Sequence, residues 1–552
     1  MRDIVWVRGG ACDGTLHRVS IGATPSLESA RADVGLPTRV TAVAESGSLG
    51  AMHHLVVALS LVASALCQEA LSPLRTVAMN RDSGLVSNLD PAPRVLWTTD
   101  VTVAGDWLQL HFADVNLPPG SQLKIYAPVR PDWVQWHDAR SIADYGCYSC
   151  QFVGPTLRIE LVAGAATTGN RARIDSVAVL DVGTVVDVDT ICGTTDDRVL
   201  SNDPRSGRLN ASCSAWLFSA FAAGTAGHCM TSGTAGKILH FNVPLSTASG
   251  TPVPSHPNDQ YALSTFLQSL NGGVGADWAT MSAVRNSNTQ LYPGQAQGSW
   301  YSIVPAPPLV AGQQIRVTGY GTGNGTSGSS TWNQVQKTHF GNRQSTATAT
   351  ALRYDTDTTG GNSGSAVLLE STGQMIGVHT HGGCSATSGG NSGTDALRAD
   401  FTAARLQALA LHTIGSITAV GAGCGGLQVP TLLVSGLPEI AMPMSVIATN
   451  LHAATPQLGW FAIGLSSTTW SGASLPVDMT PLGVEGCLLR VSLDYTESIV
   501  STFGVAGRSY TMPNDPGLVG QHLYFQYFGF SPSATTTLGL VGSNMVDVLL
   551  GN

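Results

Sequence analysis

The chain has 552 residues, which at roughly 150 residues per domain suggests three or four folding units, and its formal net charge is −9 with only 11% charged residues. This composition excludes a basic surface of the kind that holds a nucleic-acid backbone, and no apolar run reaches the roughly 18–20 residues that span a bilayer. A hydrophobic fraction of 43% argues against wholesale disorder, and 63 Gly with 28 Pro favour many short strands joined by tight turns.

The N-terminal region has the pattern of an exported protein. Residues 1–51 show no periodicity, and we interpret them as a non-functional leader or a mis-called start. A second methionine then opens residues 52–67, where a short polar start precedes an apolar run at 55–66. This is typical of a secretory signal peptide, with cleavage expected after Ala65 or Cys67. A buried core helix is the alternative, but polar residues end the run abruptly.

Three β-rich segments follow. Residues 68–185 contain short stretches of alternating apolar and polar residues, a pattern that predicts an antiparallel β-sandwich. Residues 186–415 are rich in Gly, Ser and Thr and end in one helical stretch at 397–411. A Gly-rich segment then opens a third β-rich unit, residues 420–552, which we expect to be sandwich-like.

Export would place the cysteines in an oxidising compartment, where an even number favours disulfides. Eight of the ten cysteines lie beyond the leader and signal peptide. Cys147 and Cys150 form a C-x-x-C pair, for which we expect a local disulfide, because zinc would need further ligands and a redox site would need a thioredoxin-like context. Cys213 and Cys229 are placed to pair across a hairpin.

Three short motifs in the central segment contain the residue types of nucleophilic catalysis. His228 lies in an Ala-Gly-His-Cys motif, Asp277 in Gly-Ala-Asp-Trp-Ala, and Ser363 in Gly-Gly-Asn-Ser-Gly. Their order and surroundings resemble the chymotrypsin-like (trypsin-fold) serine peptidases over roughly residues 190–415. The resemblance implies a two-barrel protease domain in this segment and does not extend to its flanks. Together with the β-sandwich pattern before it and the sandwich-like unit after it, the predicted fold class is mainly β.

Two of these residues have rivals in the sequence. The Gly-x-Ser-Gly pattern is a weak signal in a chain so rich in Gly and Ser, and it recurs at Ser392. Ser363 is favoured because two apolar strands follow it, whereas Ser392 leads into the terminal helix. Asp259 is the rival of Asp277, which is favoured because the apolar strand start that follows it would bury its carboxylate.

The chemistry explains why these residue types are needed. A serine hydroxyl is a poor nucleophile at neutral pH, so His228 would take the proton of Ser363 and later protonate the leaving amine. A buried Asp277 would fix the imidazole tautomer and stabilise the imidazolium. The backbone N–H groups of Gly361 and Ser363 would form the oxyanion hole. This mechanism requires no metal and no cofactor.

The specificity pocket is open to two interpretations. In glutamyl endopeptidases, a threonine five residues before the nucleophile and a histidine about fifteen after it hold the substrate carboxylate. These offsets find Thr358 and His379, and Thr380 lies on the same expected pocket wall. A trypsin-like pocket would instead want an acid, for which Asp357 is available. A preference for Glu is therefore a hypothesis.

Further resemblances concern the remaining cysteines and the flanking units. Secreted lysyl endopeptidases tie an N-terminal segment to the pocket region, which implies a Cys192–Cys384 disulfide and leaves Cys424 and Cys487 to pair in the last unit. The N-terminal sandwich is similar to the pro-regions of such bacterial peptidases, which assist folding or block the cleft of a zymogen. The C-terminal unit is similar to accessory β-domains of large secreted bacterial proteins.

Together these features predict a secreted, monomeric serine endopeptidase that acts on protein or peptide substrates. They predict no nucleic-acid partner and no membrane span. A catalytically inactive protease fold used for adhesion or binding is the rival hypothesis. An acyl-transferring esterase on the same barrel is a third.

Overall fold

The structure is a computed structural model that describes residues 4–8, 12, 16–20, 74–180, 190–270, 273–303, 310–346, 348–440, 442–513 and 515–551. The chain divides into two compact units, Met1–Leu409 and Ala410–Asn552. The predicted signal peptide lies outside the described residues, as does most of the predicted leader. None of the described helices has the length and apolar character needed to cross a bilayer.

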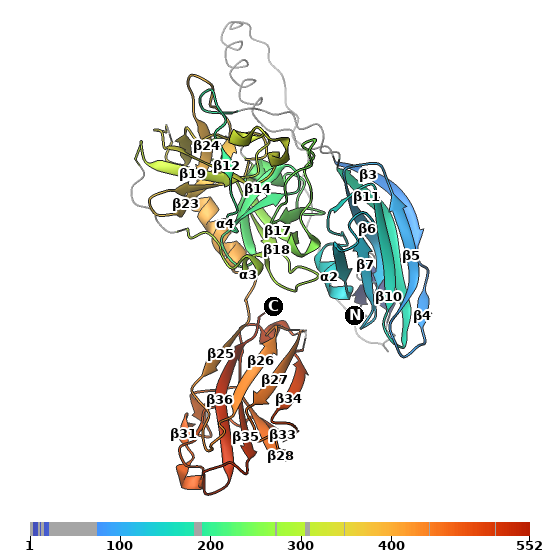
Figure 1. Cartoon of the computed structure of the whole chain (residues 1–552), viewed down its shortest axis with the longest axis vertical. Helices are drawn as coiled ribbons and strands as arrows, with labels where there is room; N and C mark the ends of the chain where they lie inside the picture. Colours follow the sequence, from blue (N-terminus) through green and yellow to red (C-terminus); the bar gives the residue numbers. More distant parts are fainter. Residues whose placement is uncertain are drawn as a thin grey trace, which may run out of the picture. The chain divides into compact units, whose positions relative to one another are not determined.

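The first unit begins with a β-sandwich of two antiparallel sheets (Figure 1). One sheet has the order β5 (Arg94–Thr102), β10 (Thr156–Ala163), β7 (Gln122–Tyr126) and β8 (Val134–His137). The other has the order β3 (Leu74–Asp82), β11 (Thr167–Leu180), β6 (Trp107–Asn116) and β9 (Phe152–Val153), with β4 (Val86–Asn88) paired to β11. A separate pair joins β1 (Ile4–Arg8) and β2 (Leu16–Ser20).

The alternating sequence pattern explains the sandwich. In β10 every second residue is buried, so Leu157, Ile159 and Leu161 enter the core while the residues between them face outward. The short helix α2 (Ala139–Asp144) covers one end and begins at Asp138, whose carboxylate accepts the backbone N–H of Ser141. The alternation therefore places one face of each strand in a common core.

The next part of this unit is a closed six-stranded barrel. Its order is β13 (Ser206–Leu209), β14 (Cys213–Leu217), β15 (Ala222–Thr225), β18 (Asp277–Ala283), β17 (Gln260–Leu270) and β16 (Ile238–His240). Three short helices belong to this region: η2 (Gly227–Met230), η3 (Pro257–Asp259) and α3 (Pro293–Gln297). Every residue of β18 is buried, because this strand lies in the wall of the barrel.

A seven-stranded antiparallel sheet forms the second half of the central region. Its order is β12 (Val199–Leu200), β20 (Lys337–Asn342), β19 (Gln314–Gly319), β22 (Ala366–Leu369), β23 (Gln374–His381), β24 (Asn391–Asp395) and β21 (Ala351–Tyr354). Helices η4 (Gly325–Ser327) and η5 (Ser330–Trp332) lie between β19 and β20 in the chain, and α4 (Ala399–Leu409) follows β24 and packs against β17 and β18 of the barrel. The barrel and this sheet confirm the predicted mainly β, two-barrel architecture.

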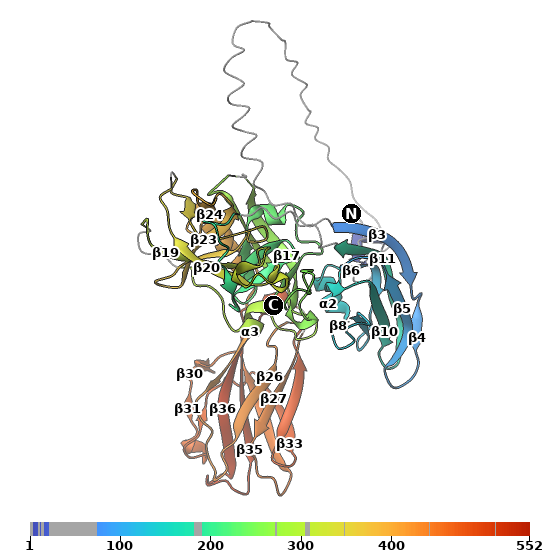
Figure 2. The ribbon, with the colours of Figure 1, turned by 45° about the horizontal axis from the view of Figure 1, so that its top comes forward.

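The second unit is also built from two antiparallel sheets, whose long strands run alongside one another (Figure 2). The larger sheet has the order β25 (Ser416–Val420), β36 (Leu540–Leu549), β35 (His522–Phe530), β28 (Gln457–Gly464) and β33 (Tyr495–Ser501). The smaller contains β26 (Thr431–Gly436), β27 (Pro443–Thr449) and β34 (Ala506–Thr511). The short elements are β29 (Thr469–Trp470), β30 (Ala473–Ser474), β31 (Val477–Asp478), β32 (Leu488–Leu489), η6 (Thr480–Leu482) and η7 (Pro516–Leu518).

The structure contains three of the four expected disulfides: Cys192–Cys384, Cys213–Cys229 and Cys424–Cys487.

The expected Cys147–Cys150 disulfide is wrong. Cys147 is bonded to Cys12, and Cys150 is a free thiol buried in the sandwich core, with its sulfur 3.9 Å from the Pro257 carbonyl oxygen. Cys147 adopts a positive φ of 67° in the turn after α2, so the two side chains of the motif do not meet. Cleavage at the predicted signal-peptide site would remove Cys12 and leave Cys147 without this partner.

Candidate active site

The structure brings His228, Asp277 and Ser363 into one chain of hydrogen bonds. Nε2 of His228 lies 2.8 Å from Oγ of Ser363, and Nδ1 lies 2.6 Å from Oδ2 of Asp277. The other carboxylate oxygen of Asp277 accepts the backbone N–H of His228 at 3.0 Å. All three side chains are buried. His228 is thus within hydrogen-bond distance of both Ser363 and Asp277, as the sequence predicted.

Two elements of the barrel hold the histidine and the aspartate. His228 lies in η2, directly after β15, and the Cys213–Cys229 disulfide ties this short helix to β14. Asp277 is the first residue of β18. Its backbone is held from the opposite sheet by Thr394, whose hydroxyl donates to the Asp277 carbonyl at 2.8 Å and accepts its N–H at 3.2 Å.

Burial acts against ionisation of Asp277, but the hydrogen bonds and the charge of His228 outweigh it. The net effect is that the pKa of Asp277 is lowered from its usual value. Asp277 is therefore ionised at neutral pH, and its charge favours a proton on the imidazole. This is the electrostatic state that a histidine base needs when it accepts a proton from Ser363.

The turn that carries Ser363 is fixed by Ser214 on β14. Ser214 donates its backbone N–H to the Ser363 carbonyl at 2.7 Å and its hydroxyl to the Gly361 carbonyl at 2.8 Å. Gly361 and Gly364 both have positive φ, 95° and 87°, which glycine adopts without strain. A Cβ on Gly364 would lie 2.1 Å from the Ser214 carbonyl oxygen. The turn therefore requires glycine for both conformation and space.

Arg198 also holds this turn. It is 1% exposed, and its guanidinium donates to the hydroxyl of Thr359 at 2.6 Å, to Oδ1 of Asn362 at 3.3 Å and to the Thr322 carbonyl at 2.8 Å. The guanidinium also forms a bidentate ion pair with the Asp196 carboxylate, through Nε and Nη2. Because Asn362 immediately precedes Ser363, Arg198 fixes the approach to the nucleophile. We found no sequence signal for this role.

The pocket residues expected from the sequence are also close to the site. Thr358 lies beside Thr190, with 2.9 Å between their hydroxyl oxygens, and Thr190 also donates to the Thr358 carbonyl at 2.7 Å. Nδ1 of His379 is 2.7 Å from the Tyr354 hydroxyl, and burial lowers the pKa of His379 to about 3. Thr380 follows on β23 and is buried. Thr190 and Tyr354, which hydrogen-bond to Thr358 and His379, were not predicted from the sequence.

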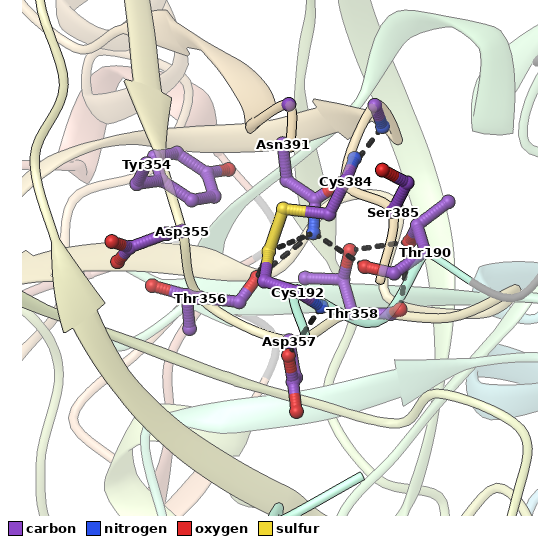
Figure 3. Close-up of a disulfide and its surroundings, with 12 residues drawn as sticks. Thr190, Cys192, Tyr354, Asp355, Thr356, Asp357, Thr358, Cys384, Ser385 and Asn391 are labelled. Carbon is purple, nitrogen blue, oxygen red and sulfur yellow. Dashed lines mark hydrogen bonds between the residues drawn. A yellow bond between two sulfur atoms is a disulfide. The ribbon is translucent and has the colours of Figure 1, made fainter. Parts of the chain in front are cut away.

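The carboxylate of Asp357, the acid expected of a trypsin-like pocket, is held by two backbone N–H groups. It accepts the backbone N–H groups of Cys192 at 2.7 Å and Asp197 at 3.3 Å. Figure 3 shows this carboxylate on the side of the Cys192–Cys384 disulfide away from Tyr354. Burial, with the neighbouring Asp197 carboxylate, raises the pKa of Asp357 to about 7.

The second Gly-Asn-Ser-Gly motif has a supporting position. Ser392 lies in β24, opposite Arg353 and His381 in the strand ladder. Asn391, the residue before it, is fully buried beside the Cys192–Cys384 disulfide and donates to the Thr190 carbonyl at 2.9 Å (Figure 3). The motif thus supports the pocket region.

The other rival residue, Asp259, also lies outside the hydrogen-bonded chain. It ends η3, and its carboxylate accepts the side-chain amide of Asn242 at 2.7 Å.

Part of the central region is similar to a known family. Residues 213–378, which include all three residues of the hydrogen-bonded chain, match the family described as "Trypsin-like peptidase domain". Among solved structures, the thermostable serine protease AL20 from an extremophilic microorganism is 18% identical with a TM-score of 0.29, over 37% of this chain and 98% of that one. Human heparin binding protein is 13% identical with a TM-score of 0.28, over 38% of this chain and 96% of that one. No curated protein matches the chain.

The packing of the nucleophile turn predicts a stability difference between two glycines. Gly364→Ala should lower the free energy of unfolding by ~3 kcal/mol or more, because the new Cβ would collide with Ser214. Gly373→Ala is the control, since Gly373 also has positive φ but no atom lies within 4 Å of the place where its Cβ would be. It should cost only about 1 kcal/mol of conformational strain. Urea unfolding measures both, and equal losses would contradict the packing argument.

Proposed function

We propose that this chain, which contains a chymotrypsin-like serine peptidase domain, is a secreted endopeptidase that cleaves peptide bonds with Ser363, His228 and Asp277. The observation that carries the proposal is the 2.8 Å distance between His228 Nε2 and Ser363 Oγ, with the Asp277 carboxylate on the far side of the imidazole. A catalytically inactive fold would have no need to preserve this geometry.

In this proposal Ser363 attacks the substrate carbonyl as its proton passes to Nε2 of His228. The same proton then moves to the leaving amine, and water repeats the cycle to release the acyl group. The developing oxyanion is stabilised by the backbone N–H groups of Gly361 and Ser363. Ser214 and Arg198 support this role, because both hold the turn by hydrogen bonds before substrate arrives.

The substrate backbone would add to the edge of β23. This strand pairs with β22 as far as Val378, whereas its pairing with β24 continues to His381. Residues 380–382 can therefore hydrogen-bond to an extended peptide that lies antiparallel to them. Thr380 would contact the substrate main chain next to the cleaved bond.

For the residue before the cleaved bond we propose a preference for Glu, with Thr358 and His379 as the carboxylate ligands. Burial keeps His379 neutral, and a Tyr354 hydroxyl that donates to Nδ1 would leave the Nε2 proton for the substrate carboxylate. The position of Asp357 supports this choice, since its carboxylate is engaged by Cys192 and Asp197. A pocket with no carboxylate free to pair with a cation suits an acidic substrate side chain better than a basic one.

Covalent labelling tests the nucleophile. The full chain should react with a fluorophosphonate probe, because such probes are attacked by an activated serine hydroxyl. Ser363→Ala should abolish labelling, whereas the matched control Ser392→Ala should retain it. Full labelling after Ser363→Ala would contradict the assignment, and no labelling of the unsubstituted chain would favour the inactive-fold alternative.

Arg198 is expected to act as a positioning residue. Arg198→Met should lower kcat/KM for a peptide substrate by ~100-fold, because a displacement of about 1 Å at the nucleophile turn is enough for such a loss. Most of the loss should be in kcat, and affinity for a peptide boronate, which places an oxygen in the oxyanion hole, should fall in parallel. Arg205→Met is the control, since Arg205 forms the same kind of pair with Asp203 away from the turn. An unchanged kcat for Arg198→Met would remove the positioning role.

Specificity is tested by digesting a peptide library and reading the cleaved bonds by mass spectrometry. We expect cuts chiefly after Glu, and His379→Leu should reduce this preference at least ~10-fold, since a buried carboxylate would lose its donor. Asp357→Asn should leave the preference unchanged. Cuts chiefly after Lys or Arg that disappear in Asp357→Asn would instead establish a trypsin-like pocket.

A further inference from the structure

The N-terminal sandwich and the first barrel are joined by hydrogen bonds between buried groups. Gln151 donates its backbone N–H to Oε1 of Gln260 at 2.8 Å, and its carbonyl accepts from Nε2 of the same residue at 2.8 Å. The Gln151 side chain continues to Nε2 of His240 at 2.9 Å and to Oδ1 of Asn210 at 3.1 Å. Gln260 and His240 are completely buried. These buried amide groups have hydrogen-bond partners only while the sandwich and the barrel are in contact.

A second group of contacts extends the junction. The Tyr145 hydroxyl donates to the Gln260 carbonyl at 2.8 Å. Asn288, beyond the end of β18, accepts the backbone N–H of Trp136 at 2.8 Å and donates to the Val134 carbonyl at 2.7 Å. The barrel therefore continues the hydrogen bonding of β8 through one asparagine side chain.

Apolar packing accompanies these hydrogen bonds. Ile238 and Ala262, both on barrel strands, belong to the same apolar core as the sandwich residues. Trp107 of the sandwich is 2% exposed, donates to the Pro252 carbonyl at 2.8 Å and lies under the guanidinium of Arg208, 4.9 Å from the ring centroid. Separation of the two parts would expose this shared core to water, which opposes dissociation.

His240 is a neutral member of this junction. Burial lowers the pKa of His240 well below its usual value, and the nearby Arg208 charge acts in the same direction. His240 therefore stays uncharged and bonds to Gln151 on one side and to Ser255 at 3.0 Å on the other.

The junction avoids the catalytic residues. The barrel residues that hydrogen-bond to the sandwich are Asn210, His240, Pro252, Pro257, Gln260, Ser287 and Asn288. Within the part of the chain that the structure describes, none of them belongs to the hydrogen-bonded chain of Ser363 or to the pocket. The sandwich thus rests on the barrel that supplies His228 and Asp277 without occupying their surroundings.

From these contacts we propose that the N-terminal sandwich is a permanent, non-inhibitory support of the first barrel that stays docked in the working enzyme. Of the two roles known for such pro-regions, this geometry favours structural support over blockage of the cleft. The statement about the working enzyme rests on the proposed peptidase function, whereas the support role does not.

Variants at the junction test the proposal in the full chain. Gln151→Ala and the milder Tyr145→Phe should each lower the midpoint of thermal unfolding by about 2–4 °C or more. Tyr126→Phe is the control, because its hydroxyl hydrogen-bonds within the sandwich, to Glu160, and away from the junction. Tyr126→Phe should keep fluorophosphonate labelling up to the same temperature as the unsubstituted chain, whereas the two junction variants should lose it at a lower temperature. At 25 °C all three variants should label at the unsubstituted rate.

The outcomes separate the possibilities. Faster labelling of the junction variants would overturn the proposal, because it would indicate a sandwich that blocks the cleft. Unchanged unfolding midpoints of both junction variants would also overturn it. If no form of the chain is labelled, the proposed peptidase function fails, but the unfolding midpoints still decide whether the sandwich supports the barrel.

A cleavage experiment provides the second measurement. A recognition site for a specific protease is inserted within residues 181–189, between the sandwich and the barrel, and the purified chain is cut there. The four disulfides among the described residues each join cysteines on one side of this cut, so they cannot hold the pieces together. We expect the pieces to elute together in gel filtration and to label as before. Separate elution would overturn permanent docking.

Discussion

Ser214 connects the closed barrel and the seven-stranded sheet beside the hydrogen-bonded chain of His228 and Ser363. It belongs to β14 of the closed barrel, yet its N–H and hydroxyl both donate to carbonyl oxygens of the other half, those of Ser363 and Gly361. The imidazole of His228 comes from the barrel and the nucleophile from the facing sheet, so a shift between the halves would break their 2.8 Å contact. Thr394 makes the reciprocal connection, from the sheet to the backbone of Asp277. The site therefore depends on polar bonds that cross between the halves in both directions.

Several residues that hold the Ser363 turn and its surroundings in place lie outside residues 213–378, the segment that matches the peptidase family. Arg198 precedes residues 213–378, and so does Thr190, while Asn391 and Thr394 follow them. The Cys192–Cys384 disulfide joins these two flanks beside the pocket. A chain trimmed to residues 213–378 would keep His228, Asp277 and Ser363, and also Ser214, but would lose the support that Arg198 gives to the Ser363 turn.

The sequence predicted the parts of the site that are encoded locally. His228, Asp277 and Ser363 each lie in a motif of about five residues, and the alternation of apolar residues located strands such as β10. Their supports could not be found in this way, because they act over long separations: Arg198 and Asn362 are 164 residues apart. The C-x-x-C motif shows the opposite failure. Proximity in sequence suggested a local disulfide, but the backbone turns Cys147 towards Cys12 and leaves Cys150 in the core.

The repeated Gly-Asn-Ser-Gly motif shows why composition alone cannot rank such candidates. Both copies need small residues, but for different reasons. At Ser363 the glycines allow positive φ and a close approach to Ser214. At Ser392 the neighbouring glycines let β24 lie against its partners: a Cβ on Gly393 would be 2.3 Å from the Val378 carbonyl oxygen, in the strand that leads to His379. One copy therefore carries the serine that meets His228, and the other allows β24 to pack closely against β23. The same four residues occur at both places because in each place there is little room beside the backbone for a side chain. The two copies differ in the residues from distant parts of the chain that contact them.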